Sequence, residues 1–143
     1  GKPFFIYKFR SMRVGAEEGT PQLTEQNDER VTKIGRFLRN HHLDELPQLW
    51  NVLVGDMSFI GYRPERQYFI DRIMEHDNRY EQLYKMRPGV TSYATLYNGY
   101  TDTMEKMLKR LEYDLYYLEH HSMLFDMKIL YLTAMNIITG KKF

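Results

Sequence analysis

The sequence contains no cysteine among its 143 residues, which excludes a disulfide framework, thiolate zinc sites and a thiol nucleophile. It also lacks an excess of either charge, because 20 Lys and Arg stand against 19 Asp and Glu. A formal net charge of +1 argues against binding of nucleic acid by bulk charge, although a local basic patch stays open. No stretch reaches the roughly 20 apolar residues of a membrane-spanning helix. The nearest candidate, Ile129 to Ile138, contains Thr133 and Asn136.

An initiator methionine is absent as well. Gly1 is followed almost at once by the apolar run Pro3 to Tyr7, whereas native termini usually begin with polar residues that fray. We therefore expect a piece of a longer protein, whose targeting or membrane segments stay open. What is present, 43% hydrophobic and 27% charged residues in 17.3 kDa, predicts one globular domain over residues 1–143. The 12 tyrosines fit either a core whose hydroxyls reach the surface or an interface.

Hydrophobic periodicity predicts a helix-dominated α+β domain with several short helices and a few short strands. Helices are expected at Val31–Leu38, Leu46–Leu53, Glu65–Tyr84, Asp102–Leu118 and Ser122–Gly140. Extended segments or strands are expected at Pro3–Met12, Met57–Ile60 and Val90–Tyr97, and a mobile loop at Val14–Glu29.

Local signals set several of the expected helix ends. Gly55 is typical of a helix stop, and Ser122 of an N-cap. Asp102 followed by Glu105 fits an acidic capping box. Pro47 is compatible with a helix only in its first turn.

The densest polar group is the pair Asp44 and Glu45, just before Pro47. If Pro47 lies in the first turn, Asp44 falls at or beside the helix N-cap, where free N–H groups and the helix dipole favour an ionised carboxylate. An Asp at this place is most often only a cap. Two vicinal carboxylates can instead divide the work of nucleophile and of metal or proton handling.

A second group of residues is cationic. Lys8 and Arg10 alternate with aromatic residues, so both point to one face of an extended segment. Arg63 precedes Pro64 in a turn, where a guanidinium can be aimed at a phosphate. Arg36 adds charge in the helix before Asp44, as does Arg39. Each alone reads as a solvated surface cation; together with the carboxylates they outline a site for a metal-bound diphosphate.

Ordered motifs make the sequence resemble the bacterial sugar transferases, the monotopic polyprenyl-phosphate phosphoglycosyl transferases that begin bacterial glycan synthesis. The motifs are Tyr7-Lys8-Phe9-Arg10-Ser11-Met12, Thr32-Lys33-Ile34-Gly35-Arg36-Phe37-Leu38-Arg39, Leu43-Asp44-Glu45-Leu46-Pro47-Gln48-Leu49-Trp50-Asn51-Val52-Leu53 and Gly55-Asp56-Met57-Ser58-Phe59-Ile60-Gly61. The likeness continues through Arg87-Pro88-Gly89-Val90-Thr91 and Asp126-Met127-Lys128-Ile129-Leu130.

The resemblance implies transfer of a sugar-1-phosphate from a UDP-sugar to polyprenyl (undecaprenyl) phosphate through an aspartyl-phosphosugar intermediate, with Mg²⁺ required. It starts capsule, O-antigen, exopolysaccharide or glycoprotein glycan synthesis. It also implies a membrane surface as partner, at the cytoplasmic face of the bacterial inner membrane. A homodimer is kept open and nucleic acid is not expected.

The resemblance also implies residue roles. Asp44 is then the nucleophile and Glu45 its acidic partner, both as Mg²⁺ ligands. Phosphate binding falls to Lys8, Arg10 and Arg63, and supporting roles to Gln48, Asp56 and Arg36.

Three departures from the family pattern carry expectations of their own. Tyr62 stands where the family commonly has proline, so we expect a freer backbone before Arg63. Residues 92–95 read Ser-Tyr-Ala-Thr where Gly-Leu-Ala-Gln is frequent, which concerns acceptor or sugar recognition more than the chemistry. The re-entrant membrane helix of the family precedes the Lys-Phe-Arg motif, so it is expected upstream of this chain.

Two other classes of function stay open. A non-catalytic, membrane-associated interaction domain fits the aromatic and Met content, and would tolerate loss of Asp44 or Glu45. A nucleic-acid-binding module would use Lys8, Arg10 and the basic helix near residues 30–39, with salt-dependent binding to single strands. The near-neutral net charge disfavours the latter.

Overall fold

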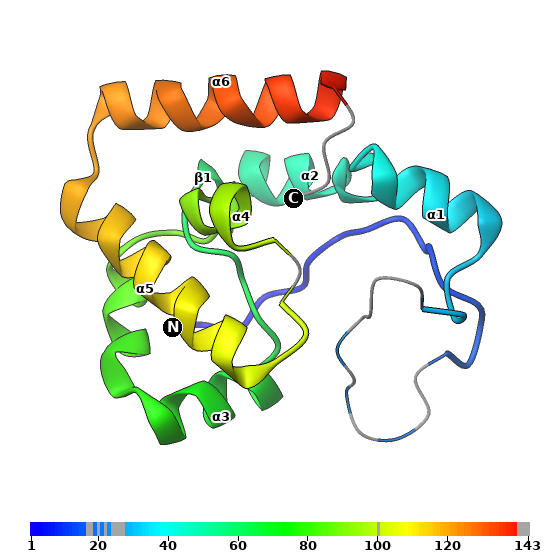
Figure 1. The fold of residues 1–143 in the computed structure, drawn as a ribbon, viewed down its shortest axis with the longest axis horizontal. Coiled ribbons are helices and arrows are strands. Elements are labelled where there is room, and N and C mark those ends of the chain that lie inside the picture. The colour runs from blue at the N-terminus through cyan, green and yellow to red at the C-terminus, as the bar shows by residue number, and fades with distance from the viewer. Residues whose placement is uncertain (17–18, 20, 22, 24–27, 100, 140–143) are drawn as a thin grey trace.

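The computed structural model describes residues 1–16, 19, 21, 23, 28–99 and 101–139 (Figure 1). Helices dominate, which confirms the helix-dominated α+β class. The α-helices are α1 (Lys33–Asn40), α2 (Gln48–Val54), α3 (Gln67–His76), α4 (Tyr93–Asn98), α5 (Met104–His120) and α6 (Met123–Thr139). The 3₁₀ helices are η1 (Leu43–Glu45) and η2 (Asn78–Lys85), and the strands are β1 (Ser58–Ile60) and β2 (Gly89–Thr91).

The two strands form a small parallel sheet. Ser58 pairs with Gly89 and Ile60 with Thr91, and the connection between the strands carries α3 and η2. The strand expected at Met57–Ile60 is confirmed. The one expected at Val90–Tyr97 is wrong beyond Thr91, because the Ser92 hydroxyl accepts a hydrogen bond from the N–H of Thr95 and begins α4.

The single helix expected over Glu65–Tyr84 is also wrong. Asp77 has extended φ and ψ, and its side chain accepts a hydrogen bond from the N–H of Arg79. This local bond competes with helix continuation, so α3 ends at His76 and a 3₁₀ helix follows. The apolar residues Phe69, Ile73 and Leu83 of this segment are nevertheless buried.

The main core lies where α5 packs against α3 and η2, in the lower half of Figure 1. Its buried members are Tyr62, Phe69, Ile70, Ile73, Tyr80, Leu83, Met107, Leu111 and Leu115. A smaller cluster of Ile60, Tyr117 and Ile129 lies where α6 contacts the sheet.

Of the two N-caps expected for α5 and α6, the one of α6 is confirmed and the one of α5 is wrong. Ser122 Oγ accepts from the N–H of Phe125, which confirms this cap. The acidic capping box at Asp102 is wrong by one residue: Thr103 caps α5 by accepting from the N–H of Lys106. Asp102 instead forms an ion pair with the Lys106 side chain. The expected helix end, Gly140, lies outside the described residues.

The N-terminal segment is extended but belongs to neither strand. Its end forms an isolated antiparallel bridge between Met12 and Val31. Helix α1 then packs directly on this segment, because a Cβ on Gly35 would lie 1.9 Å from the Ser11 carbonyl oxygen. Only glycine permits this approach. Within the loop expected at Val14–Glu29, residues 17–18, 20, 22 and 24–27 lie outside the described part.

Helix α2 buries its polar face and exposes its apolar face. It ends at Gly55, whose φ of 91° is that of a left-handed cap, as expected. Its buried residues, however, are Gln48 and Asn51. The leucines that predicted the helix lie outside: Leu49 is 47% and Leu53 76% exposed. The helix expected to begin at Leu46 begins at Gln48, after Pro47.

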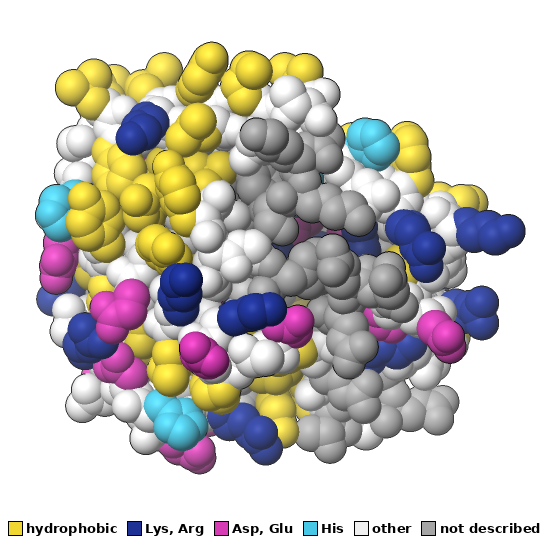
Figure 2. Space-filling view, in the orientation of Figure 1, with side chains coloured by type: hydrophobic (Ala, Val, Ile, Leu, Met, Phe, Trp, Pro, Cys, Tyr) yellow, Lys and Arg dark blue, Asp and Glu magenta, His cyan; other side chains and the backbone are white. Residues whose placement is uncertain are grey.

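The outward leucines of α2 are part of a wider apolar surface. Further exposed apolar side chains lie on α1 (Ile34 and Phe37), on α2 and just before it (Leu46, Trp50 and Val54), and on α6 (Met123, Leu124, Met127, Tyr131 and Ile138). In Figure 2 hydrophobic side chains gather over α6, along the upper edge of the molecule. Among the described helices, none combines the length and apolar character needed to cross a membrane.

Candidate active site

The two vicinal carboxylates lie in the 3₁₀ turn η1, between α1 and α2. Asp44 is buried, at 8% exposure, and Glu45 is half-buried. The expectation that Asp44 caps a helix is wrong, because α2 begins at Gln48, four residues later, and its N-cap is Pro47. Both carboxylates lie instead in a separate 3₁₀ turn, which His42 precedes with a left-handed backbone. The N–H of Phe9 donates to the Asp44 carbonyl at 2.9 Å, which attaches this turn to the N-terminal segment.

Glu45 is the acceptor for two cations from distant parts of the sequence. Lys8 Nζ and Arg63 Nη2 both lie 2.9 Å from Glu45 Oε1. Burial by itself raises the pKa of Glu45, but the charges of Arg63 and Lys8 and their hydrogen bonds outweigh it and hold this pKa well below the usual range. Glu45 is therefore ionised and is a poor proton acceptor. The same pairing raises the pKa of Arg63.

Asp44 has the opposite electrostatic environment. Burial and the neighbouring Glu45 charge raise its pKa above the usual value, against the opposing charges of Lys8 and Arg39. A partly desolvated carboxylate is more basic, and therefore a better nucleophile when ionised, than one in water. Adjacent carboxylates with pKa values shifted in opposite directions are suited to different tasks.

Lys8 is placed by a side-chain amide on α2. Asn51, which is fully buried, accepts from the N–H of Tyr7 at 3.1 Å and donates from Nδ2 to the Phe5 carbonyl at 2.8 Å. These bonds fix the main chain on both sides of Ile6. Lys8 follows directly and reaches Glu45.

Arg63 is placed by the end of the sheet. Tyr62 forms a parallel bridge with Pro88, and its carbonyl accepts from the N–H of Gly89 at 2.8 Å. Its ring is buried in the main core. The expectation of a freer backbone at Tyr62 is therefore wrong, because these contacts hold the residue that aims Arg63.

A cavity of about 1000 Å³ lies beside the carboxylates, between the N-terminal segment and the chain around residues 62–70. Seven lysine and arginine side chains line it: Lys2, Lys8, Arg10, Arg13, Arg39, Arg63 and Arg66. Asp44 and Glu45 are not among the described residues of its wall, although Lys8 and Arg63 connect the wall to Glu45. Lys8 and Arg10 both line this cavity, as does Phe9 between them. The cavity can take an anionic ligand of nucleotide size.

The predicted supporting residues do not all reach this site. Gln48 is buried on α2, one turn from Glu45. Arg36 and Asp56 are exposed, and within the described ranges no contact joins either side chain to the two carboxylates.

Three residues for which sequence patterns indicated no clear role contribute to the surroundings of the site: Arg39, His42 and Asn51. Arg39 donates from Nε to Ser11 Oγ at 2.8 Å, and its charge acts on Asp44. His42 has a left-handed backbone, and burial lowers its pKa. Asn51 was detectable, because it and Gln48 are polar at i and i+3 on a helix that is otherwise apolar.

The oxygen donors fit a magnesium ion held jointly with a substrate. Within the described part of the chain, no group of three or more His, Cys, Asp or Glu side chains could hold a metal. Mg²⁺ is commonly bound by one or two carboxylates together with substrate phosphates. Asp44 and Glu45 supply two carboxylates, and Lys8 and Arg63 both contact the same oxygen of Glu45.

Comparison with known proteins identifies the family. Residues 1–140 match the family described as bacterial sugar transferase. The chain is 43% identical over 150 residues to UDP-glucose:undecaprenyl-phosphate glucose-1-phosphate transferase of Escherichia coli, a match covering 99% of the chain and 31% of the relative. It is 38% identical over 139 residues to UDP-N-acetylgalactosamine-undecaprenyl-phosphate N-acetylgalactosaminephosphotransferase of Aeromonas hydrophila, covering 97% and 33%.

A third relative is matched over more of its own length. The exopolysaccharide production protein PSS of Rhizobium leguminosarum is 40% identical over 150 residues, with 99% of the chain and 74% of the relative covered. The chain thus spans about a third of the first two relatives and about three quarters of the third. With its whole described length matched in this way, the chain belongs to the bacterial sugar transferase family.

Proposed function

We propose that the protein transfers a sugar-1-phosphate from a UDP-sugar to undecaprenyl phosphate, at the start of bacterial polysaccharide synthesis. The observation that carries the proposal is the pair Asp44 and Glu45, with pKa values shifted in opposite directions beside a cation-lined cavity. The relatives support the substrate classes, since their names specify UDP-sugars and undecaprenyl phosphate.

The transfer proceeds in two displacements at one phosphorus atom. An Asp44 carboxylate oxygen attacks the β-phosphorus of the donor, and the bond from this phosphorus to the bridging oxygen breaks, so that UMP leaves with that oxygen. An oxygen of undecaprenyl phosphate then attacks the same phosphorus. The Asp44–phosphorus bond breaks, the carboxylate is regenerated, and the product is undecaprenyl diphosphate sugar.

Lys8 and Arg63 make the first attack feasible. A diphosphate repels an anionic nucleophile, so positive charge must lie at its oxygens before the two approach. Glu45 holds both cations through one oxygen, which preorganises them toward the cavity. We assign Glu45 this orienting task rather than proton transfer, because its pKa is lowered. Arg10 and Arg39 extend the positive wall.

Mg²⁺ belongs to the proposal as a cofactor. Asp44 and Glu45 would hold it together with donor phosphates, and when bound it supplies charge neutralisation at the diphosphate.

We also propose that the apolar surface of α1, α2 and α6 faces a lipid bilayer. The acceptor carries its phosphate at the bilayer surface, so the site must be held there to meet it. Exposed Leu53 and Ile138, at 76% and 78%, are the kind of side chain that enters the headgroup boundary. The cytoplasmic face of the inner membrane is proposed because UDP-sugars are made in the cytoplasm.

The decisive experiment offers the full-length protein a panel of UDP-sugars, with and without polyprenyl phosphate, and measures UMP release. One donor of the panel should release UMP and yield lipid-linked sugar. Absence of UMP with every donor, in a folded and lipid-supplied protein, contradicts the proposal. Salt-dependent binding to single-stranded nucleic acid in the same preparation would point to a different class of function.

A further inference from the structure

Arg63 lies between two carboxylates, of which one belongs to the candidate active site. Its Nη2 donates to Glu45 Oε1 at 2.9 Å. Glu65 acts on the same guanidinium through its charge. The Glu65 carboxylate is itself engaged by α5, because Arg110 Nη1 donates to Glu65 Oε1. Arg63 is therefore paired with Glu45, and Arg110 with Glu65.

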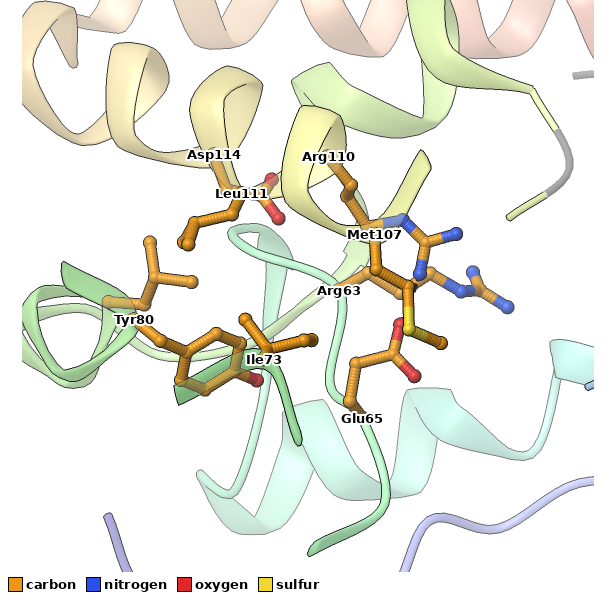
Figure 3. A pocket seen from close by; sticks show the side chains of 9 residues that line it. Arg63, Glu65, Ile73, Tyr80, Met107, Arg110, Leu111 and Asp114 are labelled. Atoms are coloured by element: carbon orange, nitrogen blue, oxygen red, sulfur yellow. Dashed lines mark hydrogen bonds and ion pairs between the residues drawn. The ribbon is translucent and has the colours of Figure 1, made fainter. Parts of the chain in front are cut away.

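Asp114 lies beside Arg63, on the same helix as Arg110. Its side chain is buried, at 2% exposure, and lines the same internal cavity as Arg63, where its Oδ1 has no hydrogen-bond partner among the described residues. Asp114 lies four residues after Arg110 on α5, so both side chains project from one face of the helix. Figure 3 shows both beside Arg63 and Glu65, around an internal cavity of about 10 Å³.

We propose that Arg110 is a positioning residue for Arg63: it keeps Glu65 from competing with Glu45 for the Arg63 guanidinium. The inference rests on the proposed function, because it gives α5 a part in the reaction only if Glu45 and Arg63 serve the transfer.

Glu65 would compete with Glu45 for Arg63 because little water reaches the Glu65 carboxylate. The Glu65 side chain is 16% exposed and that of Arg110 13%. A carboxylate with so little hydration cannot stay unpaired without a large cost, so it recruits a cation within reach. Without Arg110, that cation is Arg63. Its guanidinium would then move away from Glu45 and from the phosphate site, although no residue contacting substrate has changed.

The test is a double-variant cycle in the full-length protein, read as kcat/KM for UMP release. Arg110→Met should lower kcat/KM at least about tenfold, since a small misplacement of a charged group has effects of this size or larger. Adding Glu65→Gln should restore kcat/KM to within about threefold of the parent, because the competing charge is gone. A purely structural role of the ion pair predicts that both variants keep the parental kcat/KM once rates are normalised to the folded fraction.

Further variants separate positioning from folding, with every rate normalised to the folded fraction from circular dichroism. Tyr80→Phe is the matched control: its hydroxyl lines the same cavity and has no hydrogen-bond partner among the described residues. If Arg110→Met fails to fold, Arg110→Gln takes its place, with a loss of the same sign.

The outcomes distinguish this inference from the proposed function. Folded Arg110 variants with parental kcat/KM, or a double variant that is no better than Arg110→Met, overturn the competition. Full activity of Asp44→Asn would instead refute the proposed function, whatever the Arg110 variants show.

Discussion

Lys8 and Glu45, 37 residues apart in the sequence, meet at 2.9 Å between Nζ and Oε1. The contact joins an extended N-terminal segment to the turn that carries both candidate catalytic carboxylates. Arg63 reaches the same oxygen from the end of the sheet. Three segments without local sequence relationship thus converge on one carboxylate, and the predictions below concern what this convergence does.

Asp44→Asn should abolish turnover, by at least about a thousandfold, because an amide cannot attack phosphorus. The fold should survive, since burial and the Glu45 charge already disfavour the ionised form of Asp44 and Asn is isosteric. UMP release and thermal melting measure the two effects. Intact mass after incubation with donor alone should show a phosphosugar adduct on the parent and none on the variant. Normal turnover of the variant contradicts the nucleophile.

Glu45→Gln should impair both activity and stability, because Lys8 and Arg63 lose the charge that holds them. We expect a loss of about 1–3 kcal/mol in the free energy of unfolding in urea, with kcat/KM reduced at least about tenfold. Glu112→Gln is the matched control, since it removes a 59% exposed partner of Arg79 far from the site. Equal effects of the two substitutions would refute the role of Glu45.

The pH dependence of the free energy of unfolding should report the ionisation of Asp114. Burial raises the pKa of Asp114 to about 8, from an ordinary value of 3.8. A carboxyl with a raised folded-state pKa stabilises the fold fully below its unfolded pKa, and this contribution is lost as the pH rises through the folded pKa. The free energy of unfolding of the parent, relative to Asp114→Asn, should therefore fall between about pH 4 and pH 8. Urea unfolding from pH 5 to 9 checks the sign, and a flat or rising difference contradicts it.

UMP release should depend on Mg²⁺, because all the candidate metal ligands are oxygen atoms. Excess chelator should abolish UMP release, and added Mg²⁺ should restore it better than softer metals such as Zn²⁺. Melting temperature without substrate should change little, because the metal is held partly by donor phosphates. Full activity in excess chelator would rule out the metal.

Leu53→Gln should weaken binding to anionic vesicles without lowering the melting temperature, because Leu53 is 76% exposed. Flotation with liposomes measures the bound fraction. Val14→Gln is the control, since Val14 is 85% exposed but lies outside α1, α2 and α6. A membrane surface made by these helices requires the two variants to differ.

Local sequence signals predicted the elements whose cause is local. Ser122 caps α6, Gly55 ends α2, and an apolar run forms β1, because each depends on its nearest neighbours. Hydrophobic periodicity predicted the wrong buried face for α2, because it does not distinguish a protein core from another apolar environment. Leu49 and Leu53 face outward.

The candidate site was predictable as a set of residues but not as a geometry. The motifs named Asp44, Glu45, Lys8 and Arg63, yet no spacing shows that two cations share one oxygen of Glu45. Arg110 and Asp114 carried no signal, because they look like ordinary charged positions on a helix until α5 is packed under Arg63.

The bonds from Asn51 to the main chain on both sides of Ile6 distinguish two kinds of sequence change in the N-terminal segment. The side chains of Phe5 and Tyr7 are 86% and 49% exposed, so their replacement leaves both bonds in place. Deletion of Lys8 instead shifts the following residues by one position and brings the Phe9 ring, in place of an ammonium group, towards Glu45. This stretch therefore tolerates changes of residue type far better than changes of length.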